Sequence, residues 1–185
     1  MIKTKKFVCC LFAAMLLAAA SFVSYGNGSE AGGGAVVQSG EDFKSFLEKF
    51  TSSAAFQYTR VRFPLKTPIV LLADDGETEK TFPFTKEKWP LLDGETLKEE
   101  RIEREEGGVY ISGFILDGPK HKVFEAGYEE SEMDLRVEFE LAPDGKWYVV
   151  DCYTAWYGFD LPADELEQTV RLVAEENAAF KELHP

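Results

Sequence analysis

Two arginines stand close together inside an aromatic stretch of the chain, "AAFQYTRVRFPL" at residues 54–65. If residues 60–63 are extended, Arg60 and Arg62 project to one side of the backbone, and the apolar residues between and after them project to the other. Two guanidinium groups on one side could bind a carboxylate or another anion through bidentate hydrogen bonds. The alternative is ion pairing with nearby Glu and Asp residues, which is worth no more than roughly 1 kcal/mol at an exposed site.

One carboxylate is a candidate for acid–base catalysis. Asp151 lies between the apolar segments "WYVV" and "CYTAW". A carboxyl group beside the apolar wall of a cavity has a raised pKa, which suits it to proton transfer. If Asp151 instead faces outward on a strand or pairs with an arginine, its role is structural, and the sequence leaves both interpretations open.

No other set of residues in the sequence is typical of catalysis or metal binding. His121 and His184 are the only histidines, and two scattered histidines do not make a metal site. The sequence has no H-E-x-x-H, no G-x-S-x-G and no glycine-rich phosphate loop after a strand. We therefore predict no metal, no cofactor and no catalytic residue other than the alternative, Asp151.

Three aromatic residues near Asp151 could line the concave face of a curved sheet: Trp147, Tyr153 and Trp156. Aromatic walls are typical of small-molecule pockets, and the alternative is that these residues belong to the core. Two hypotheses follow. The first is a non-catalytic ligand-binding or protein-interaction module that uses these aromatics with the two arginines. The second is a small enzyme of isomerase or hydratase type, which a cavity converging on Asp151 would favour.

Residues 1–26 have the layout of an export signal. Three lysines at positions 3, 5 and 6 precede the apolar run "FVCCLFAAMLLAAASFV", and small residues follow it. This order predicts a signal peptide cleaved near residues 20–28 and a periplasmic or extracellular protein. The alternative is an uncleaved N-terminal membrane anchor, because the run is just long enough to span a bilayer of about 30 Å.

The charge of the chain narrows the choice of partners. The sequence has 20 Lys and Arg and 33 Asp and Glu, a formal net charge of −13; removal of the signal takes away three lysines and leaves −16. Such a surface repels nucleic-acid phosphates and anionic lipid. We therefore predict a small molecule or a protein as partner, no nucleic acid, and no membrane contact after cleavage.

After removal of the signal, Cys152 would be the only cysteine, so no internal disulfide could form. Its apolar context indicates a small buried residue.

Residues 27–40 are rich in glycine and small polar residues and predict a flexible linker. A single domain over residues 41–185 follows. Its first segment has phenylalanine or leucine at positions 43, 46, 47 and 50, the spacing of an amphipathic helix. A second helical turn is expected over residues 52–58. A C-terminal helix is predicted after Pro162, with an apolar stripe that contains Leu166, Val170, Val173 and Phe180.

Between these helices the sequence reads as antiparallel strands. Residues 69–73 and 80–84 flank the turn "DDGETE", and residues 109–116 and 121–128 flank "DGPK". Residues 132–141 alternate apolar and polar side chains strictly, which indicates a half-buried strand, and "WYVVDCYTAWYGF" runs back beside it. The charged stretch before residue 108 favours a strand over a helix, and Gly113 is the expected site of a β-bulge.

Helices at both ends of a run of long antiparallel strands predict an α+β roll, a curved sheet packed on the N-terminal helix with a C-terminal helix. The segments "FKSFLEKFTSSAAFQYTRVRFPL" (43–65) and "DGKWYVVDCYT" (144–154) resemble a family of exported proteins of Bacteroides and relatives, a domain of unknown function of the DUF4348 type. The resemblance covers residues 41–158. It implies an NTF2-like, cystatin-like roll and an exported location, and it supplies no catalytic residues. An acidic residue that precedes the F-Q pair in the family is replaced by Ala54 and Ala55. A homodimer is implied by analogy with such open sheets.

Overall fold

The computed structural model describes residues 40–104, 108–129, 131, 133–158 and 160–185. The predicted export signal and nearly all of the predicted linker lie outside the described residues. All described residues belong to one compact unit. The elements in chain order are α1 (Phe43–Ser52), α2 (Ala54–Arg60), β1 (Ile69–Leu72), β2 (Glu79–Phe82), the 3-10 turn η1 (Lys86–Lys88), β3 (Glu100–Arg104), β4 (Gly108–Asp117), β5 (His121–Tyr128), β6 (Met133–Leu141), β7 (Trp147–Thr154), the 3-10 turns η2 (Ala155–Tyr157) and η3 (Ala163–Glu165), and α3 (Leu166–Leu183).

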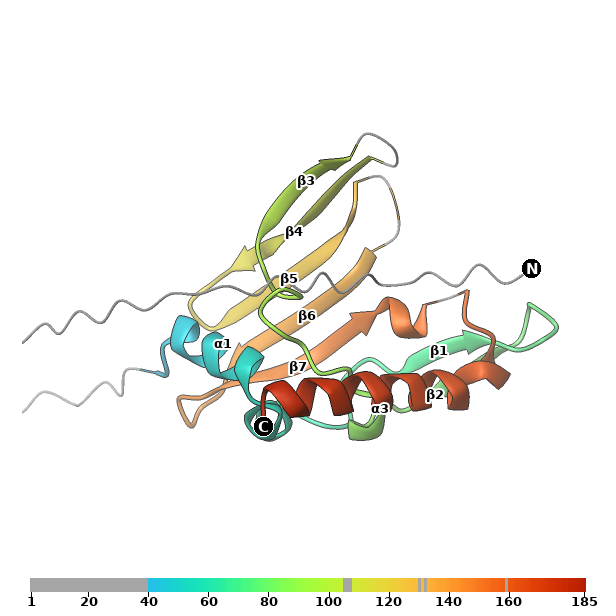
Figure 1. Ribbon diagram of the computed structural model, residues 1–185, viewed down its shortest axis with the longest axis horizontal. Helices are drawn as coiled ribbons and strands as arrows, with labels where there is room; N and C mark the ends of the chain where they lie inside the picture. Colours follow the sequence, from blue (N-terminus) through green and yellow to red (C-terminus); the bar gives the residue numbers. More distant parts are fainter. Residues whose placement is uncertain (1–39, 105–107, 130, 132, 159) are drawn as a thin grey trace, which may run out of the picture. The chain divides into compact units, whose positions relative to one another are not determined.

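The main sheet is an antiparallel meander in the order β3-β4-β5-β6-β7, and β1 and β2 form a separate hairpin. Figure 1 shows the five strands fanning out above α1 and α3, with β3 furthest from α3. The predicted alternation in β6 is confirmed, because Leu135, Val137 and Phe139 are buried between less buried polar neighbours. The observed architecture is therefore the predicted α+β class with a curved antiparallel sheet.

Among the described residues, three irregularities in strand pairing bend the main sheet. They fall between Phe114 and Leu116, between Ala126 and Gly127, and between Glu138 and Phe139. The prediction of a bulge at Gly113 was wrong, since Gly113 pairs regularly with Glu125 and the extra residue follows Phe114. A bulge of this kind needs no positive φ angle, so it does not require glycine.

The inner side of the sheet packs on the aromatic face of α1. Phe46 and Phe50 are fully buried, and the centroid of each ring lies 6.0 Å from that of Phe139 on β6. Phe43 contacts Phe139 and Trp147 edge to face, at 5.4 and 4.9 Å. Aromatic pairs in this geometry add about 0.5–1.5 kcal/mol each beyond the burial of their area. The helix is started by Asp42, whose carboxylate accepts a hydrogen bond from the Ser45 N–H.

A buried glutamine fixes the chain between η1 and β3. Gln57 on α2 is fully buried, and its amide nitrogen donates to the carbonyls of Phe50 and Leu92 at 2.7 and 2.8 Å. Its amide oxygen accepts from Trp89 Nε1 and from the Leu92 N–H, both at 2.9 Å. All hydrogen-bonding positions of the amide face partners, so this buried polar side chain stabilises one arrangement of the segment "WPLL".

Helix α3 covers the same segment from the other side. Leu166 and Val173 of the predicted stripe are buried, while Val170 and Phe180 are only partly buried. The stripe also contains buried polar residues that hydrophobicity could not reveal. One of them, Asn177, accepts from the Leu91 N–H at 2.7 Å and donates to the carbonyl of Trp89 at 2.8 Å.

Candidate functional site

Arg60 is the last residue of α2 and is not in an extended segment, so the predicted backbone geometry at this position was wrong. Its guanidinium donates to both carboxylate oxygens of Glu41, at 2.8 and 3.0 Å, and to the carbonyl of Trp147 at 3.2 Å. Only 12% of the Arg60 side chain is exposed. Glu41 also accepts from the Trp147 N–H at 2.9 Å. The ion pair therefore fastens the start of the domain to β7, which is the structural alternative considered for this arginine.

Arg62 is the exposed member of the pair. Its guanidinium carbon lies 4.5 Å from the centroid of the Tyr148 ring, and that of Arg60 lies 5.6 Å from the same ring. The two arginines thus lie on one side of the chain, although Arg60 is helical. The Tyr148 hydroxyl donates to Asp144 at 2.8 Å, and this hydrogen bond is the main reason that the pKa of Asp144 is lowered. An anion at this surface would meet one exposed guanidinium beside a carboxylate, not two free ones.

The three predicted aromatic residues do not form one lining. Trp147 is 2% exposed in the core, where its ring nitrogen donates to the Glu41 carbonyl at 2.9 Å. Trp156 is partly buried in η2 and packs against the core. Tyr153 lies on the outer face of β7, opposite Arg136. The pairing irregularity beside Glu138 adds one residue to β7, so the odd-numbered residues before it, such as Trp147, and those after it, such as Tyr153, point to opposite faces of the sheet.

Asp151 lies on the outer face too, and its carboxylate is already used. It accepts hydrogen bonds from the Thr67 N–H at 3.0 Å, the Thr67 hydroxyl at 2.6 Å and the Cys152 N–H at 3.0 Å. A shallow hollow of about 230 Å³ borders it, lined also by Arg136, Glu138 and Tyr153. Because these bonds tie the chain at Thr67 to β7, they match the structural interpretation of Asp151 and not that of a catalytic base in the concave face.

The residues between Arg60 and Thr67, which both bind β7, run along the edge of this strand. Val61 pairs in parallel with Val149. The Arg62 N–H donates to the Val149 carbonyl at 3.0 Å, and the Lys66 N–H donates to the Val150 carbonyl at 3.3 Å. We call residues 61–67 the edge cover, because they occupy carbonyls that β7 would otherwise present to solvent.

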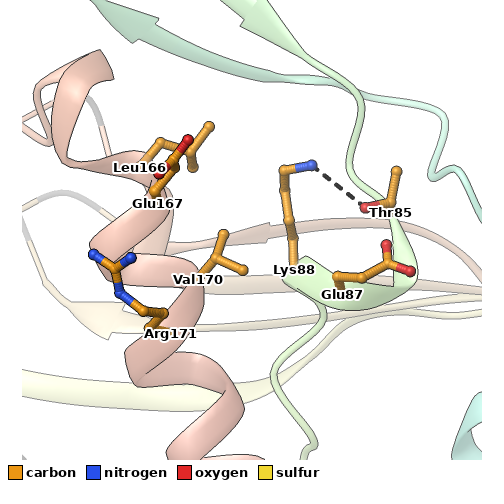
Figure 2. A pocket seen from close by; sticks show the side chains of 7 residues that line it. All are labelled: Thr85, Glu87, Lys88, Leu166, Glu167, Val170 and Arg171. Atoms are coloured by element: carbon orange, nitrogen blue, oxygen red, sulfur yellow. Dashed lines mark hydrogen bonds between the residues drawn. The ribbon is translucent and has the colours of Figure 1, made fainter.

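A larger hollow, of about 450 Å³, lies between η1 and the first turns of α3. Figure 2 shows Val170 at its centre, with Lys88 and Glu87 on the η1 side and Arg171 on the α3 side. We call it the η1–α3 groove; it is lined by Thr85, Glu87, Lys88, Leu166, Glu167, Val170 and Arg171. Its floor is aliphatic and its rim carries charges of both signs.

The sequence pattern does not indicate this groove, and the reason is physical. Its two sides are about 80 residues apart in the chain, and only the folded chain brings them together. Val170 was assigned to the core stripe of the helix, although it is only partly buried. Lys88 is held in place by donating to the Pro83 carbonyl at 3.0 Å and to the Thr85 hydroxyl at 3.3 Å.

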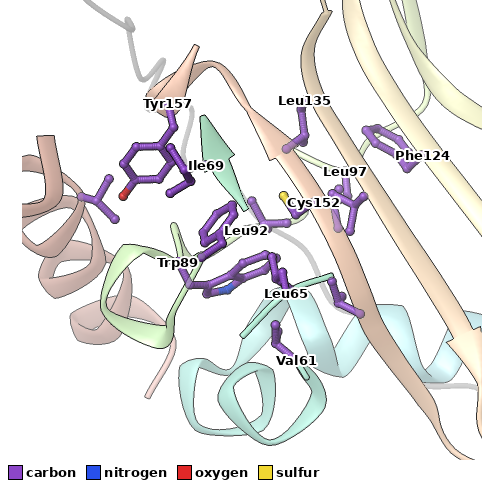
Figure 3. Close-up of a cluster of buried hydrophobic side chains, with 14 of the residues drawn as sticks. Val61, Leu65, Ile69, Trp89, Leu92, Leu97, Phe124, Leu135, Cys152 and Tyr157 are labelled. Carbon is purple, nitrogen blue, oxygen red and sulfur yellow. The ribbon is translucent and has the colours of Figure 1, made fainter. Parts of the chain in front are cut away.

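The space under the inner face of the sheet is occupied by apolar side chains. Figure 3 shows Leu65, Trp89 and Leu92 packed against one another beside the strands, and each is at most 5% exposed. Cys152 belongs to the same cluster, and burial raises the pKa of its thiol strongly. This thiol is therefore not a reactive group, as its apolar context in the sequence predicted.

The described part of the chain has no group of three or more His, Cys, Asp or Glu side chains that could hold a metal ion. In the same residues, no helix has both the length and the apolar character needed to cross a membrane.

Comparison with known proteins gives three close structural relatives. A crystal structure of a cystatin-like protein from Bacteroides caccae is 80% identical, with a TM-score of 0.78, and the match covers 82% of this chain and 100% of that one. An NMR structure of a protein from Bacteroides ovatus is 77% identical (TM-score 0.76; 84% and 100% covered), and one from Bacteroides uniformis is 69% identical (0.75; 79% and 98% covered). A protein-family model matches residues 41–181 of this chain. No curated protein matches the chain.

Proposed function

The chain belongs to the family of the cystatin-like protein from Bacteroides caccae, and we propose that it acts as an exported, non-catalytic binding module. We further propose that its roll is of the NTF2-like type and that the family is the one of DUF4348 type. The packing of α1 against the inner side of a bent five-stranded meander supports this fold assignment.

The observation that carries the binding proposal is the η1–α3 groove. Its volume of about 450 Å³ falls in the range of roughly 300–1,000 Å³ that is usual for small-molecule sites. An aliphatic floor of Leu166 and Val170 with cations at Lys88 and Arg171 and anions at Glu87 and Glu167 complements a molecule with apolar bulk and charges of both signs. The ligand class proposed is therefore a zwitterionic, partly apolar molecule such as a short peptide.

A thermal-shift screen with short peptides and amino-acid derivatives tests this proposal. Arg171→Glu should weaken binding of any hit by about tenfold or more, because a charge-assisted hydrogen bond is replaced by repulsion. The matched control is Lys44→Glu, the same charge change at an exposed position of α1, which should leave the affinity unchanged. Equal affinity of both variants for every hit would refute the groove as the site.

Asp151→Asn separates the binding proposal from the enzyme hypothesis. In the binding proposal this change leaves ligand affinity unchanged, because Asp151 lies in a different hollow from the groove. An isomerase or hydratase activity that is present in the wild type and lost in Asp151→Asn would contradict the assignment as a non-catalytic module.

Export is proposed from the N-terminal sequence alone, since residues 1–26 lie outside the described residues. Cleavage near residues 20–28 removes the basic start and the apolar run. Mass spectrometry of the protein from fractionated cells gives the N-terminus directly. A mature chain that starts near these positions and is released with the periplasm or the medium is expected, whereas an intact chain in the membrane fraction would favour the anchor alternative.

A further inference from the structure

Strand β3 forms the outer edge of the main sheet. It pairs with β4 on one side, from Glu100 opposite Ser112 to Arg104 opposite Gly108. In the described part of the chain no strand or isolated bridge pairs with its other side. Arg101, Ile102 and Glu103 are all exposed, and Figure 1 shows β3 at the top of the sheet, away from the helices.

The charge sequence of this edge is complementary to itself. In an antiparallel pair of two β3 strands centred on Ile102, each Arg101 faces Glu103 of the other copy, and the two Ile102 side chains face each other. The sequence also has a glutamate at position 100 and an arginine at position 104, which extends the same complementarity. We propose that a second copy of this chain binds along β3 in this register, which joins the two sheets into one.

Other symmetric registers are disfavoured by like charges. A pair centred on Arg101 would place two arginines directly opposite each other, and a pair centred on Glu103 would place two glutamates opposite each other. Like charges at opposite positions destabilise a strand pair, and opposite charges stabilise it. The edge therefore selects one register and, by the same mechanism, discourages unspecific pairing with other strands.

The apolar side chains on β3 and its neighbours are also compatible with the proposed pairing. Ile102 lies opposite Tyr110 of β4, and Tyr110 lies opposite Tyr128 of β5, with the two rings 5.2 Å apart in an edge-to-face contact. The proposed pair would bring the second Ile102 to the end of this row, so that aromatic and aliphatic side chains continue across the two-fold axis. At present Ile102 is 37% exposed, and the pairing would cover part of that area.

The contact is small. Five residues on each side bury much less than the roughly 1,200 Å² of a standard stable interface, so the proposed dimer is weak, reversible and concentration-dependent. The proposal is independent of the η1–α3 groove and of any ligand there.

Sedimentation velocity of the purified protein over a concentration series tests the proposal with charge-reversal variants. The wild type should show a monomer–dimer equilibrium. Arg101→Glu and Glu103→Arg each place like charges opposite each other and should weaken self-association by about tenfold or more. An equimolar mixture of the two variants restores both opposite-charge contacts, so a heterodimer should form. The variant with both changes should again form a homodimer.

Glu77→Arg, at the exposed tip of the β1–β2 hairpin, controls for the change in net charge in Glu103→Arg, and Lys44→Glu, at an exposed position of α1, controls for that in Arg101→Glu. Arg101 also makes an exposed ion pair with Glu129, at 3.3 Å, so circular dichroism and the melting temperature of each variant should accompany the measurement. Loss of this exposed pair is expected to have little effect on folding. A wild type that remains monomeric at the highest concentration, or a variant mixture that does not associate, would overturn the proposal.

Discussion

The five-stranded sheet ends at β7 on one side and at β3 on the other. In the described part of the chain, only the β7 edge is covered by another segment. Residues 61–67 run along β7 and bind its carbonyls with the N–H groups of Arg62 and Lys66. Among the described residues, nothing comparable lies along β3. An uncovered edge is a template for pairing with another chain. The β7 edge is therefore closed within one molecule, whereas the β3 edge is available to a second one.

The edge cover also closes the sheet chemically. Pro64 lies within it and Pro68 follows it directly, and proline has no N–H to offer a further strand. The covering segment therefore does not itself become a new edge. Strand β3 has no proline and uses charged side chains instead, which oppose most partners and admit a complementary one. Two physical devices, missing donors and patterned charge, thus give the two edges different binding properties.

The largest predicted effect is loss of the anchor that holds the helix before the edge cover. Gln57→Leu would leave the partners of the glutamine amide unpaired, among them Trp89 Nε1 and the Leu92 N–H. Each buried unpaired group costs about 1–3 kcal/mol. We expect the free energy of unfolding to fall by about 4 kcal/mol and the melting temperature by roughly 10 °C, as measured by urea and thermal denaturation. Gln168→Leu, the same change at an exposed position of α3, should cost less than about 0.5 kcal/mol.

Replacement of one residue by lysine at each edge tests whether the two edges differ. Val61 in the edge cover is 7% exposed and Ile102 in β3 is 37% exposed. Val61→Lys should lower the free energy of unfolding by about 3 kcal/mol, because an ammonium group enters the core. Ile102→Lys, measured at low concentration, should change it by less than about 0.5 kcal/mol. Similar losses for both variants in urea denaturation would mean that the two edges do not differ as described.

A smaller effect is expected from the ion pair that fixes the start of the domain beside β7. Glu41→Gln leaves the Arg60 guanidinium without a counter-ion at a site where 12% of its side chain is exposed. We expect a loss of about 2 kcal/mol, below the 3–5 kcal/mol typical when a fully buried pair is broken. Urea denaturation with Glu48→Gln, an exposed glutamate on α1, as the control measures the difference. A cost equal to that of the control would show that the pair does not fasten this end of the domain.

The sequence predicted elements whose pattern is local. The alternation of Leu135, Val137 and Phe139 gave a strand, and the phenylalanine spacing after Asp42 gave a helix. The candidate site was predicted less well, because it depends on events between segments. One extra residue in β7 turned Trp147 and Tyr153 to opposite faces, and no sequence period shows such a residue. The η1–α3 groove depends on contacts between segments far apart in the chain, for which a single sequence carries no signal.

The smallest predicted effect is a pH dependence at the covered edge. The pKa of Asp144 is lowered in the folded protein, chiefly by the hydrogen bond from the Tyr148 hydroxyl and then by that from the Lys146 N–H. A carboxylate with a lowered pKa stabilises the fold above its unfolded value of about 3.9 and loses this contribution as the pH falls. Asp144→Asn should therefore have a lower melting temperature than the wild type near neutral pH, and the difference should shrink as the pH falls below about 4.

Tyr148→Phe keeps the ring under Arg62 but removes the main cause of the pKa shift of Asp144. Its melting temperature should therefore show a weaker dependence on pH than that of the wild type. A difference between Asp144→Asn and the wild type that stays constant from neutral to strongly acidic pH would contradict this role of Asp144.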